Sequence, residues 1–331
     1  MSPAVDRSAG GPPRGIALTG ATTSGKTSVA LELARRLGGE IISMDSRQVY
    51  RGMDIGTDKV SDGHRVEIPH HGLDLVDPGE RYSAGRFSRD ARRWIGEIEA
   101  RGRVPILAGG TGFFLKSLTH PIFDEPEMDA DRRSRLQSWL DEQPPERLAD
   151  WVRRLDPDRA ELAIEGGPQR LTRTLEVPLL TGRSLSAWHR RRPAAHQPVP
   201  LLVVVLDVDR AELDRRIDAR VDRMVRDGLV EEVESLLERG FGPDAPGMTG
   251  TGYREIVDVL REGRDLDDAL DDMRAQTRRY ARRQITWFRH QLPDDAIVIE
   301  ADAPASDPDA LEDRVERIIE EWRRRRGEET P

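Results

Sequence analysis

The chain has 331 residues, of which 37% are hydrophobic, and this length allows one large or two ordinary domains with a sizeable buried core. It contains no cysteine, which excludes disulfides, thiolate catalysis and cysteine-ligated zinc. The formal net charge is -9, and this total by itself argues against a nucleic-acid partner, because such binding rests on Lys and Arg neutralising phosphates.

No stretch approaches the roughly 18 consecutive apolar residues that span a bilayer, and the N-terminus lacks the apolar segment of a secretory signal. We therefore expect a cytoplasmic protein with no membrane partner, in which residues 1–14 form a disordered N-terminal arm. A monomer is expected as well, although no sequence feature decides the oligomeric state. The pair His70-His71 is the one histidine spacing that suggests a metal site, and we interpret it as structural.

The first predicted element is a strand, Ile16–Thr19, which leads into a glycine-rich loop and then a helix. This loop satisfies the phosphate-binding motif G-x-x-x-x-G-K-[ST] in the strand-loop-helix context that the motif requires. We expect its N–H groups and the charge of Lys26 to hold a diphosphate or triphosphate, and the Thr27 hydroxyl to bind Mg2+. The residues of the loop are Gly20, Ala21, Thr22, Thr23, Ser24, Gly25, Lys26 and Thr27.

Two later strands are predicted to end in side chains suited to chemistry. Residues 40–45 end in Asp45, and residues 103–112 form a strand and glycine turn that contain Thr111. Because ligands of open parallel sheets gather outside the carboxyl ends of the strands, both side chains are expected beside the phosphate loop. Asp45 can act there as a base or as a metal partner. A kinase normally carries a magnesium-binding aspartate on a later strand, and its absence after residues 106–108 weakens phosphoryl transfer without excluding it.

The order of the remaining elements predicts the domain organisation. Residues 125–196 have a helical, charged pattern with no convincing strand, and we expect an all-helical insertion. Residues 200–209 return an apolar strand to the sheet, and helical segments follow to the end. The predicted fold is therefore α/β, with a parallel-sheet core like that of the phosphate-loop NTPases over residues 15–124 and 197–315, helices on both faces, and a charged C-terminal tail at 316–331.

A cluster of arginines qualifies the argument from net charge. The segment QTRRYARRQITWFR, Gln276–Arg289, predicts a helix with an apolar stripe. The stripe is formed by Ala281, Ile285 and Phe288, and the arginines that flank it are Arg278, Arg282 and Arg289. These arginines can point into a cleft and contact RNA. The alternative is a surface helix whose arginine side chains extend to water.

Seven segments resemble the motifs of the tRNA dimethylallyltransferases in order and approximate spacing. They are GATTSGKT, ISMDSRQVYRGMDIGTDK, IPHHGLDLVDPGERYSAGRF, AGGTGFFLKSL, QRLTRTLEV, TGYREI and RRQITWFRH. The resemblance covers Gly15 to Gln291, and D-S-x-Q-V-Y and R-Q-x-T-W-F-R are specific to this family. Its members attach a five-carbon isoprenoid to the adenosine that is 3′-adjacent to the anticodon.

The resemblance implies an alkylation rather than a phosphoryl transfer. The loop would hold the pyrophosphate of dimethylallyl diphosphate with Mg2+ and release it, while the exocyclic N6 of adenine attacks the allylic carbon. Asp45 is the implied general base, Thr111 would orient the amine or the carboxylate, and Arg220 would reach the diphosphate.

The resemblance also implies contacts with the anticodon stem-loop of tRNA. The target base must leave the anticodon stack, residues 45–48 would read it, and arginines of the insertion would hold the loop. Trp287 could stack on a base, whereas Phe288 is expected in the core. The implied tRNA-binding residues are Asp45, Ser46, Arg47, Gln48, Thr111, Arg133, Gln169, Arg170, Leu171, Thr172, Arg173, Tyr253, Arg254, Arg282, Arg283, Gln284, Trp287 and Arg289.

Three alternatives remain open at this point. A small-molecule kinase would use the same loop with ATP, but the motifs after Asp45 would be unexplained. A non-catalytic RNA-binding protein would bind tRNA without turnover, although the intact Lys26, Thr27 and Asp45 argue against it. Transfer of the isoprenoid to free adenosine nucleotides needs no long helical insertion, so the insertion favours a macromolecular acceptor.

Overall fold

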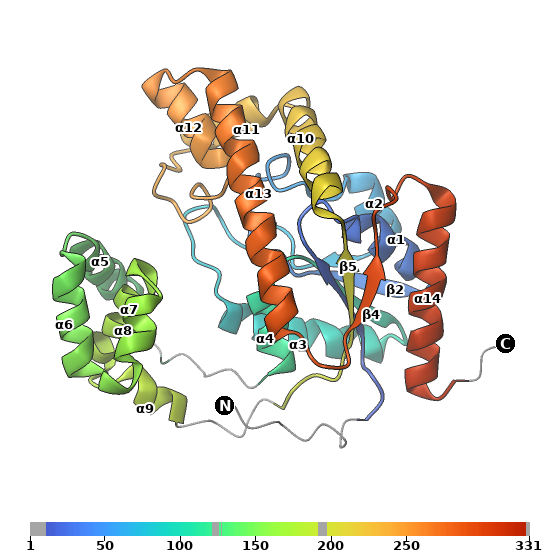
Figure 1. Ribbon diagram of the computed structural model, residues 1–331, viewed down its shortest axis with the longest axis horizontal. Helices are drawn as coiled ribbons and strands as arrows, with labels where there is room; N and C mark the ends of the chain where they lie inside the picture. Colours follow the sequence, from blue (N-terminus) through green and yellow to red (C-terminus); the bar gives the residue numbers. More distant parts are fainter. Residues whose placement is uncertain (1–10, 121–125, 127, 191–196, 329–331) are drawn as a thin grey trace. The chain divides into compact units, whose positions relative to one another are not determined.

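The computed structural model describes residues 11–120, 126, 128–190 and 197–328. Its chain forms two compact units, Met1–His120 with Pro198–Pro331, and Pro121–Gln197. The first unit contains a six-stranded sheet in the order β3-β2-β4-β1-β5-β6, in which every neighbouring pair is parallel. Figure 1 labels β2, β4 and β5 of this sheet. The strands are β1 (Ile16–Gly20), β2 (Gly39–Ser43), β3 (His70–His71), β4 (Val104–Ala108), β5 (Leu202–Asp207) and β6 (Ile297–Glu300).

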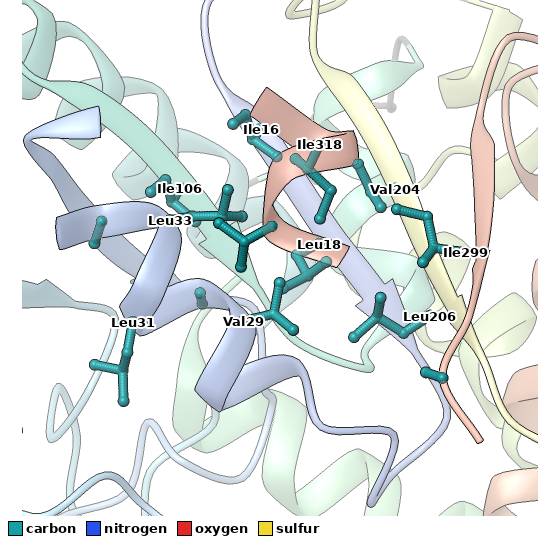
Figure 2. Close-up of a cluster of buried hydrophobic side chains, with 14 of the residues drawn as sticks. Ile16, Leu18, Val29, Leu31, Leu33, Ile106, Val204, Leu206, Ile299 and Ile318 are labelled. Atoms are coloured by element: carbon teal, nitrogen blue, oxygen red, sulfur yellow. The ribbon is translucent and has the colours of Figure 1, made fainter. Parts of the chain in front are cut away.

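Helices cover both faces of this sheet. Because side chains alternate along a strand, Ile16 and Leu18 of β1 join the core on one face, and Ala17 joins the core on the other. The first face packs against α1 (Lys26–Leu37) and α14 (Pro308–Arg326), and the second against α3 (Ala84–Ala100) and α4 (Gly112–Thr119). Figure 2 shows the first of these clusters. The predicted parallel α/β fold is confirmed.

Two expectations for the C-terminal part are wrong. The segment after Arg210 is not helical to its end, since β6 pairs with β5; its four residues are too few to show a strand pattern. The expected charged tail from residue 316 begins inside α14, where Ile318, Ile319 and Trp322 are buried against the sheet. Charged residues surround the apolar stripe of α14 in the sequence, so the composition of residues 316–331 suggests a charged tail rather than a packed helix.

A third helical cluster completes the first unit. It is formed by α10 (Arg210–Arg226), α11 (Leu229–Glu238), α12 (Tyr253–Glu262) and α13 (Leu266–Gln291), which pack on residues 49–76. The short helix α2 (Asp62–Glu67) lies in the same part of the sequence. The 26 residues of α13 also reach the sheet, because Ala281 belongs to the core on the α1 face.

The second unit is a small helical bundle that contains the expected insertion, 125–196. Its helices are α5 (Ala130–Asp141), α6 (Pro145–Leu155), η1 (Pro157–Arg159), α7 (Ala160–Glu165), α8 (Pro168–Thr181) and α9 (Leu185–Arg190). Leu140, Leu148, Val152 and Leu175 form the centre of its core. No strand occurs in the described part of this unit.

The N-terminal arm expected at residues 1–14 lies mostly outside the described residues, which begin at residue 11. Arg14 is anchored, since its N–H donates to the Pro200 carbonyl at 2.9 Å and its side chain pairs with Glu99. Among the helices that the structure describes, none is long and apolar enough to cross a membrane.

Candidate active site

The phosphate loop connects β1 to α1 with a backbone that requires glycine at two positions. Gly20 has φ 146° and Gly25 has φ 87°, conformations that side-chain-bearing residues rarely adopt. A Cβ on Gly20 would also come within 2.5 Å of the Leu206 carbonyl oxygen. These glycines therefore let the loop turn tightly over the edge of the sheet and place its N–H groups at the start of α1.

Lys26 lies beneath this loop. Its Nζ donates to the carbonyl oxygens of Gly20 at 3.1 Å and Ala21 at 2.6 Å, and to Ser24 Oγ at 3.2 Å. Burial lowers the pKa of the ammonium to about 8, and the negative charge of Asp45 opposes this change. A bound anion next to Lys26 would favour the charged form of its amine and so raise its pKa again.

A cavity of about 550 Å³ adjoins the loop within the first unit. It is lined by the phosphate loop, by Asp45, which is the second residue after β2, by the turn after β4, and by α10 and α13. Its charged side chains include Lys26, Asp45, Asp58, Glu212, Arg216, Arg220 and Arg223. The cavity therefore brings the predicted phosphate site and the predicted base together at the carboxyl edge of the sheet, where parallel α/β folds bind ligands.

Arg220 lines this cavity next to the phosphate loop. Its Nη1 donates to Thr22 Oγ1 at 2.8 Å and lies 3.7 Å from a carboxylate oxygen of Asp58, which also pairs with Arg223 at 2.8 Å. The guanidinium is thus tied to the loop itself, which is where a diphosphate would lie.

Asp45 and Thr111 lie at the ends of neighbouring strands, β2 and β4. Asp45 Oδ1 accepts a hydrogen bond from the Arg47 N–H at 2.8 Å, a local turn that fixes the carboxylate. Thr111 Oγ1 accepts from the Ser46 N–H at 3.0 Å and lies 3.4 Å from Ser46 Oγ. Thr111 is therefore held against Ser46, the residue that follows Asp45 in the chain.

Tyr280 is a residue of this site that the sequence analysis did not identify. It lines the cavity from α13, and burial together with the charge of Asp45 raises the pKa of its hydroxyl to about 12. Its signal in the sequence is the spacing to Gln284, four residues later on the same helix, which places both side chains on one face.

Gln284 was predicted to bind tRNA, but its side chain is only 6% exposed. Its Nε2 donates to the Gly110 carbonyl at 2.7 Å, and its Oε1 accepts from the Thr22 N–H at 2.9 Å. The amide is therefore engaged with the protein backbone in this structure, and its contact with tRNA stays a prediction.

Other side chains of the first unit that were predicted to bind RNA also form hydrogen bonds within the protein. Arg47 donates to the carbonyl oxygen of Pro246 at 2.8 Å, and Gln48 Nε2 donates to that of Thr57 at 3.1 Å. Tyr253 is 1% exposed and its hydroxyl donates to Glu232, so its side chain cannot reach an external ligand. These assignments followed the sequence motifs, which do not distinguish a ligand contact from an internal one.

The arginine-rich helix α13 is partly neutralised by acidic residues of α10. Arg274 pairs with Asp222 at 2.6 Å, Arg278 pairs with Asp218, and Arg282 lies 3.7 Å from Asp214. This ladder repeats every four residues on both helices, so Arg278 packs α13 on α10. Arg278, Arg282 and Arg289 also line a second cavity, as the sequence analysis allowed. The exposed side chains of α13 include Arg282, Arg283 and Arg289, while Trp287 is half-buried beside Gly112 and Phe288 is buried as expected.

In the second unit, a buried carboxylate forms ion pairs with two of the arginines that were predicted to bind tRNA. Glu176 is 1% exposed on its side chain and pairs with Arg133 at 2.6 Å and Arg173 at 2.8 Å. Leu171 and Thr172 are buried, so their predicted contact with RNA gains no support from the exposure of their side chains. Of the predicted residues of this helical unit, Gln169 and Arg170 are exposed at the start of α8.

The histidine pair and Thr27 bear on metal binding. His71 Nε2 lies 2.8 Å from Glu40, and His70 Nδ1 lies 2.7 Å from the Ile68 carbonyl, so both rings have structural partners. Within the described residues, no group of three or more histidine or acidic side chains could hold a metal ion. Thr27 is exposed at the start of α1, on the wall of the cavity.

Comparison with known proteins agrees with this geometry. The profile of the family described as "IPP transferase" matches residues 48–291, and that described as "Isopentenyl transferase" matches residues 15–65. A tRNA dimethylallyltransferase of Thermomicrobium roseum is 45% identical over 83% of this chain and 83% of its own length. One of Geobacter metallireducens is 43% identical over 83% of this chain and 89% of its own.

Solved structures give the same result. A tRNA isopentenylpyrophosphate transferase of Bacillus halodurans is 34% identical, covering 94% of this chain and 97% of its own, with a TM-score of 0.67. A eukaryotic dimethylallyltransferase acting on tRNA is 27% identical over 96% of this chain and 81% of its own, with a TM-score of 0.79. By the extent of these matches, the chain belongs to the IPP transferase family, which includes the tRNA dimethylallyltransferases.

Proposed function

We propose that this enzyme transfers a dimethylallyl group from dimethylallyl diphosphate to N6 of the adenosine 3′-adjacent to the anticodon of tRNA, releasing pyrophosphate. The observation that carries the proposal is one cavity that holds a phosphate loop at one end and Asp45 at the other. The names of the relatives support the choice of donor and acceptor. One chain supplies both ends, so we propose a monomer, acting in the cytoplasm with its tRNA.

The donor end stabilises the leaving group. The N–H groups of the loop, the start of α1 and the ammonium of Lys26 face the position of a diphosphate. Arg220 adds a guanidinium next to Thr22. As the allylic C–O bond breaks, negative charge grows on the bridging oxygen, and these fixed donors stabilise it without reorganisation.

Mg2+ fits this donor end. Thr27 offers a hydroxyl at the loop, and Mg2+ commonly combines few protein ligands with phosphate oxygens and waters. When bound, the ion would neutralise part of the charge that develops on the pyrophosphate. Thr27 would therefore hold it, with the remaining ligands supplied by the substrate and solvent.

The acceptor end removes a proton. The exocyclic amine attacks the allylic carbon, the new C–N bond leaves a positive charge on nitrogen, and the Asp45 carboxylate accepts a proton from it. The Arg47 N–H holds this carboxylate in place. We assign Thr111, whose hydroxyl oxygen accepts from the Ser46 N–H, to orienting the amine. The target base must leave the anticodon stack to reach this recessed position.

Surface arginines, with Gln169 and Trp287, then hold the rest of the anticodon arm. The candidates that remain at the surface are Gln169, Arg170, Arg254, Arg282, Arg283 and Arg289, with Trp287 half-buried. Arg133 and Arg173 act indirectly, because their pairing with Glu176 keeps α8 in its place. These local clusters supply the positive charge that the acidic total does not.

A transfer assay tests the proposal against its rivals. Dimethylallyl diphosphate labelled in the isoprenoid is incubated with Mg2+ and either unmodified tRNA, AMP or ATP. We expect label in the tRNA. Label in AMP or ATP alone would assign a free-nucleotide acceptor, tRNA binding without label would indicate a non-catalytic protein, and ADP formation from ATP would indicate a kinase.

A further inference from the structure

One buried amide joins the two ends of the reaction cavity. Gln284 of α13 accepts a hydrogen bond from the Thr22 N–H with its Oε1 and donates one to the Gly110 carbonyl with its Nε2. Thr22 belongs to the phosphate loop, and Gly110 immediately precedes Thr111. A single side chain thus connects the donor end of the cavity to the acceptor end.

The surroundings of this amide leave it little freedom. A Cβ at position 110 would lie 2.3 Å from Gln284 Nε2 and 3.2 Å from the Gly20 carbonyl oxygen, so the turn after β4 has no room for a side chain. The amide is 6% exposed, and a buried donor or acceptor left without a partner is costly. Both hydrogen bonds therefore hold the phosphate loop and the Gly110 turn at one fixed separation.

The same hydrogen bonds limit what each group can do elsewhere. The Thr22 N–H is occupied by Gln284, so a phosphate is held by later N–H groups of the loop and by Lys26. The amide itself has one donor and one acceptor already engaged with backbone, which does not suit a side chain that reads an RNA base. The Gln284 side chain therefore acts as an internal brace, by which we mean that it links the phosphate loop to the Gly110 turn.

We propose that Gln284 is a positioning residue that sets the separation between the leaving diphosphate and the Asp45 and Thr111 end, where adenine would be received. This inference rests on the proposed function, since both ends of the cavity take their roles from it. The physical reason is that the attacking nitrogen must lie in line with the C–O bond that breaks. A shift of about 1 Å in the position of either group can lower the rate by about 100-fold.

The test compares Gln284→Met, Gln284→Glu and the control Thr286→Ala. Met keeps the length of the side chain without either hydrogen bond, and Glu keeps an oxygen for the Thr22 N–H but loses the donor to Gly110. Thr286 is an exposed residue of the same helix, and its hydroxyl donates to the Arg282 carbonyl. The single-turnover rate of transfer and the Kd for tRNA are measured for each variant. The number of tRNA molecules bound per protein molecule gives the fraction of protein that is correctly folded.

We expect Gln284→Met to lower the transfer rate by ~100-fold, while the Kd for tRNA and the bound stoichiometry stay at the wild-type values. Gln284→Glu should fall between wild type and Met, and Thr286→Ala should match wild type. Gly110→Ala gives a second route to the same contact, because its Cβ displaces the amide. It should reproduce the loss of rate if Gln284→Met fails to fold.

Two results would overturn the inference. A weakened Kd for tRNA with an unchanged transfer rate would assign Gln284 to RNA binding, and unchanged values for both would show that the brace does not affect turnover. Absence of transfer by the wild-type protein is a different result, because it would remove the proposed function itself.

Discussion

Arg220 reaches from α10 to the phosphate loop, where its Nη1 donates a hydrogen bond of 2.8 Å to the Thr22 hydroxyl oxygen. This contact places beside the loop a permanent positive charge that comes from a residue outside the loop. Arg220 lies far from the loop in the sequence, so the contact exists only because α10 follows β5, the strand next to β1.

The first prediction concerns this arginine. Arg220→Ala should lower kcat/KM for the donor by ~10²- to 10³-fold, because a preorganised donor to the leaving group is lost. Steady-state kinetics with varied dimethylallyl diphosphate measure the effect. Arg226→Ala is the matched control, since this arginine is exposed on the same helix. A loss confined to KM for tRNA would contradict the assignment.

The second prediction concerns pH. The pKa of Lys26 is lowered to about 8 from 10.5, so its amine loses its charge as the pH rises through 8 in the free protein. A bound diphosphate favours the ammonium, and binding above pH 8 should take up a proton while affinity falls as the pH increases. Calorimetry of pyrophosphate binding in buffers of different ionisation heat measures this uptake. Lys26→Met should abolish both the uptake and most of the affinity.

The same pKa has a consequence for stability. The unfolded chain keeps the ordinary pKa of 10.5, so it binds more protons than the folded chain between pH 8 and 10.5. The contribution of Lys26 to the free energy of unfolding therefore increases with pH across this window. Comparison of wild type with Lys26→Met by denaturant unfolding should show this difference, and a difference that decreases over the same pH range would contradict it.

The third prediction separates catalysis from RNA binding at Asp45. Asp45→Asn keeps an oxygen for the Arg47 N–H but removes the base, so kcat should fall by ~10²- to 10⁴-fold. The Kd for tRNA should remain close to that of the wild type, because few phosphate contacts change. Rapid-quench transfer and filter binding measure the two quantities. Equal losses in both would show that Asp45 mainly positions the RNA.

The fourth prediction concerns Asp58, whose carboxylate pairs with Arg223 and lies 3.7 Å from Arg220. Asp58 and Arg223 are both substantially exposed, so this pairing is weak and a diphosphate can replace it. Asp58→Asn should tighten metal-free pyrophosphate binding by ~2- to 5-fold, because the two guanidinium groups no longer have a competing anion. Weaker binding would instead mean that Asp58 holds the arginines in position.

The fifth prediction tests the exposed face of α8. Arg170→Ala should weaken tRNA binding and reduce the slope of log Kd against log salt by about 1, as expected for one lost phosphate contact. Arg324→Ala, an exposed arginine of α14, is the control and should leave both quantities unchanged. An unchanged salt dependence in Arg170→Ala would remove this residue from the proposed tRNA-binding surface.

The phosphate loop and its strands could be predicted because the motif, the apolar strand and the helix are contiguous in the sequence. The short strand β6 and the buried stripe of α14 could not, since four residues carry little pattern and charged neighbours hide Ile318 and Trp322. Both elements depend on β5 and α1, which lie far away in the chain.

The site shows the same division. Motifs located Lys26, Asp45 and Arg220 around one cavity, because each follows a predicted element or a family pattern. Thr111 directly follows Gly110, which lines the same cavity. They did not separate exposed Arg170 from buried Leu171, because burial follows from packing within the bundle. For Gln284, they did not indicate the two backbone hydrogen bonds, which depend on tertiary contacts.

The central claim is that the phosphate loop holds a leaving group and that the isoprenoid goes to one adenine of tRNA. The most direct measurement is mass spectrometry of nucleosides after complete digestion of the product tRNA, with pyrophosphate released in the same reaction counted alongside. The account predicts N6-dimethylallyladenosine from the position 3′-adjacent to the anticodon and an equimolar amount of pyrophosphate. Release of inorganic phosphate, or an isoprenoid on any other nucleoside or on none, would contradict it.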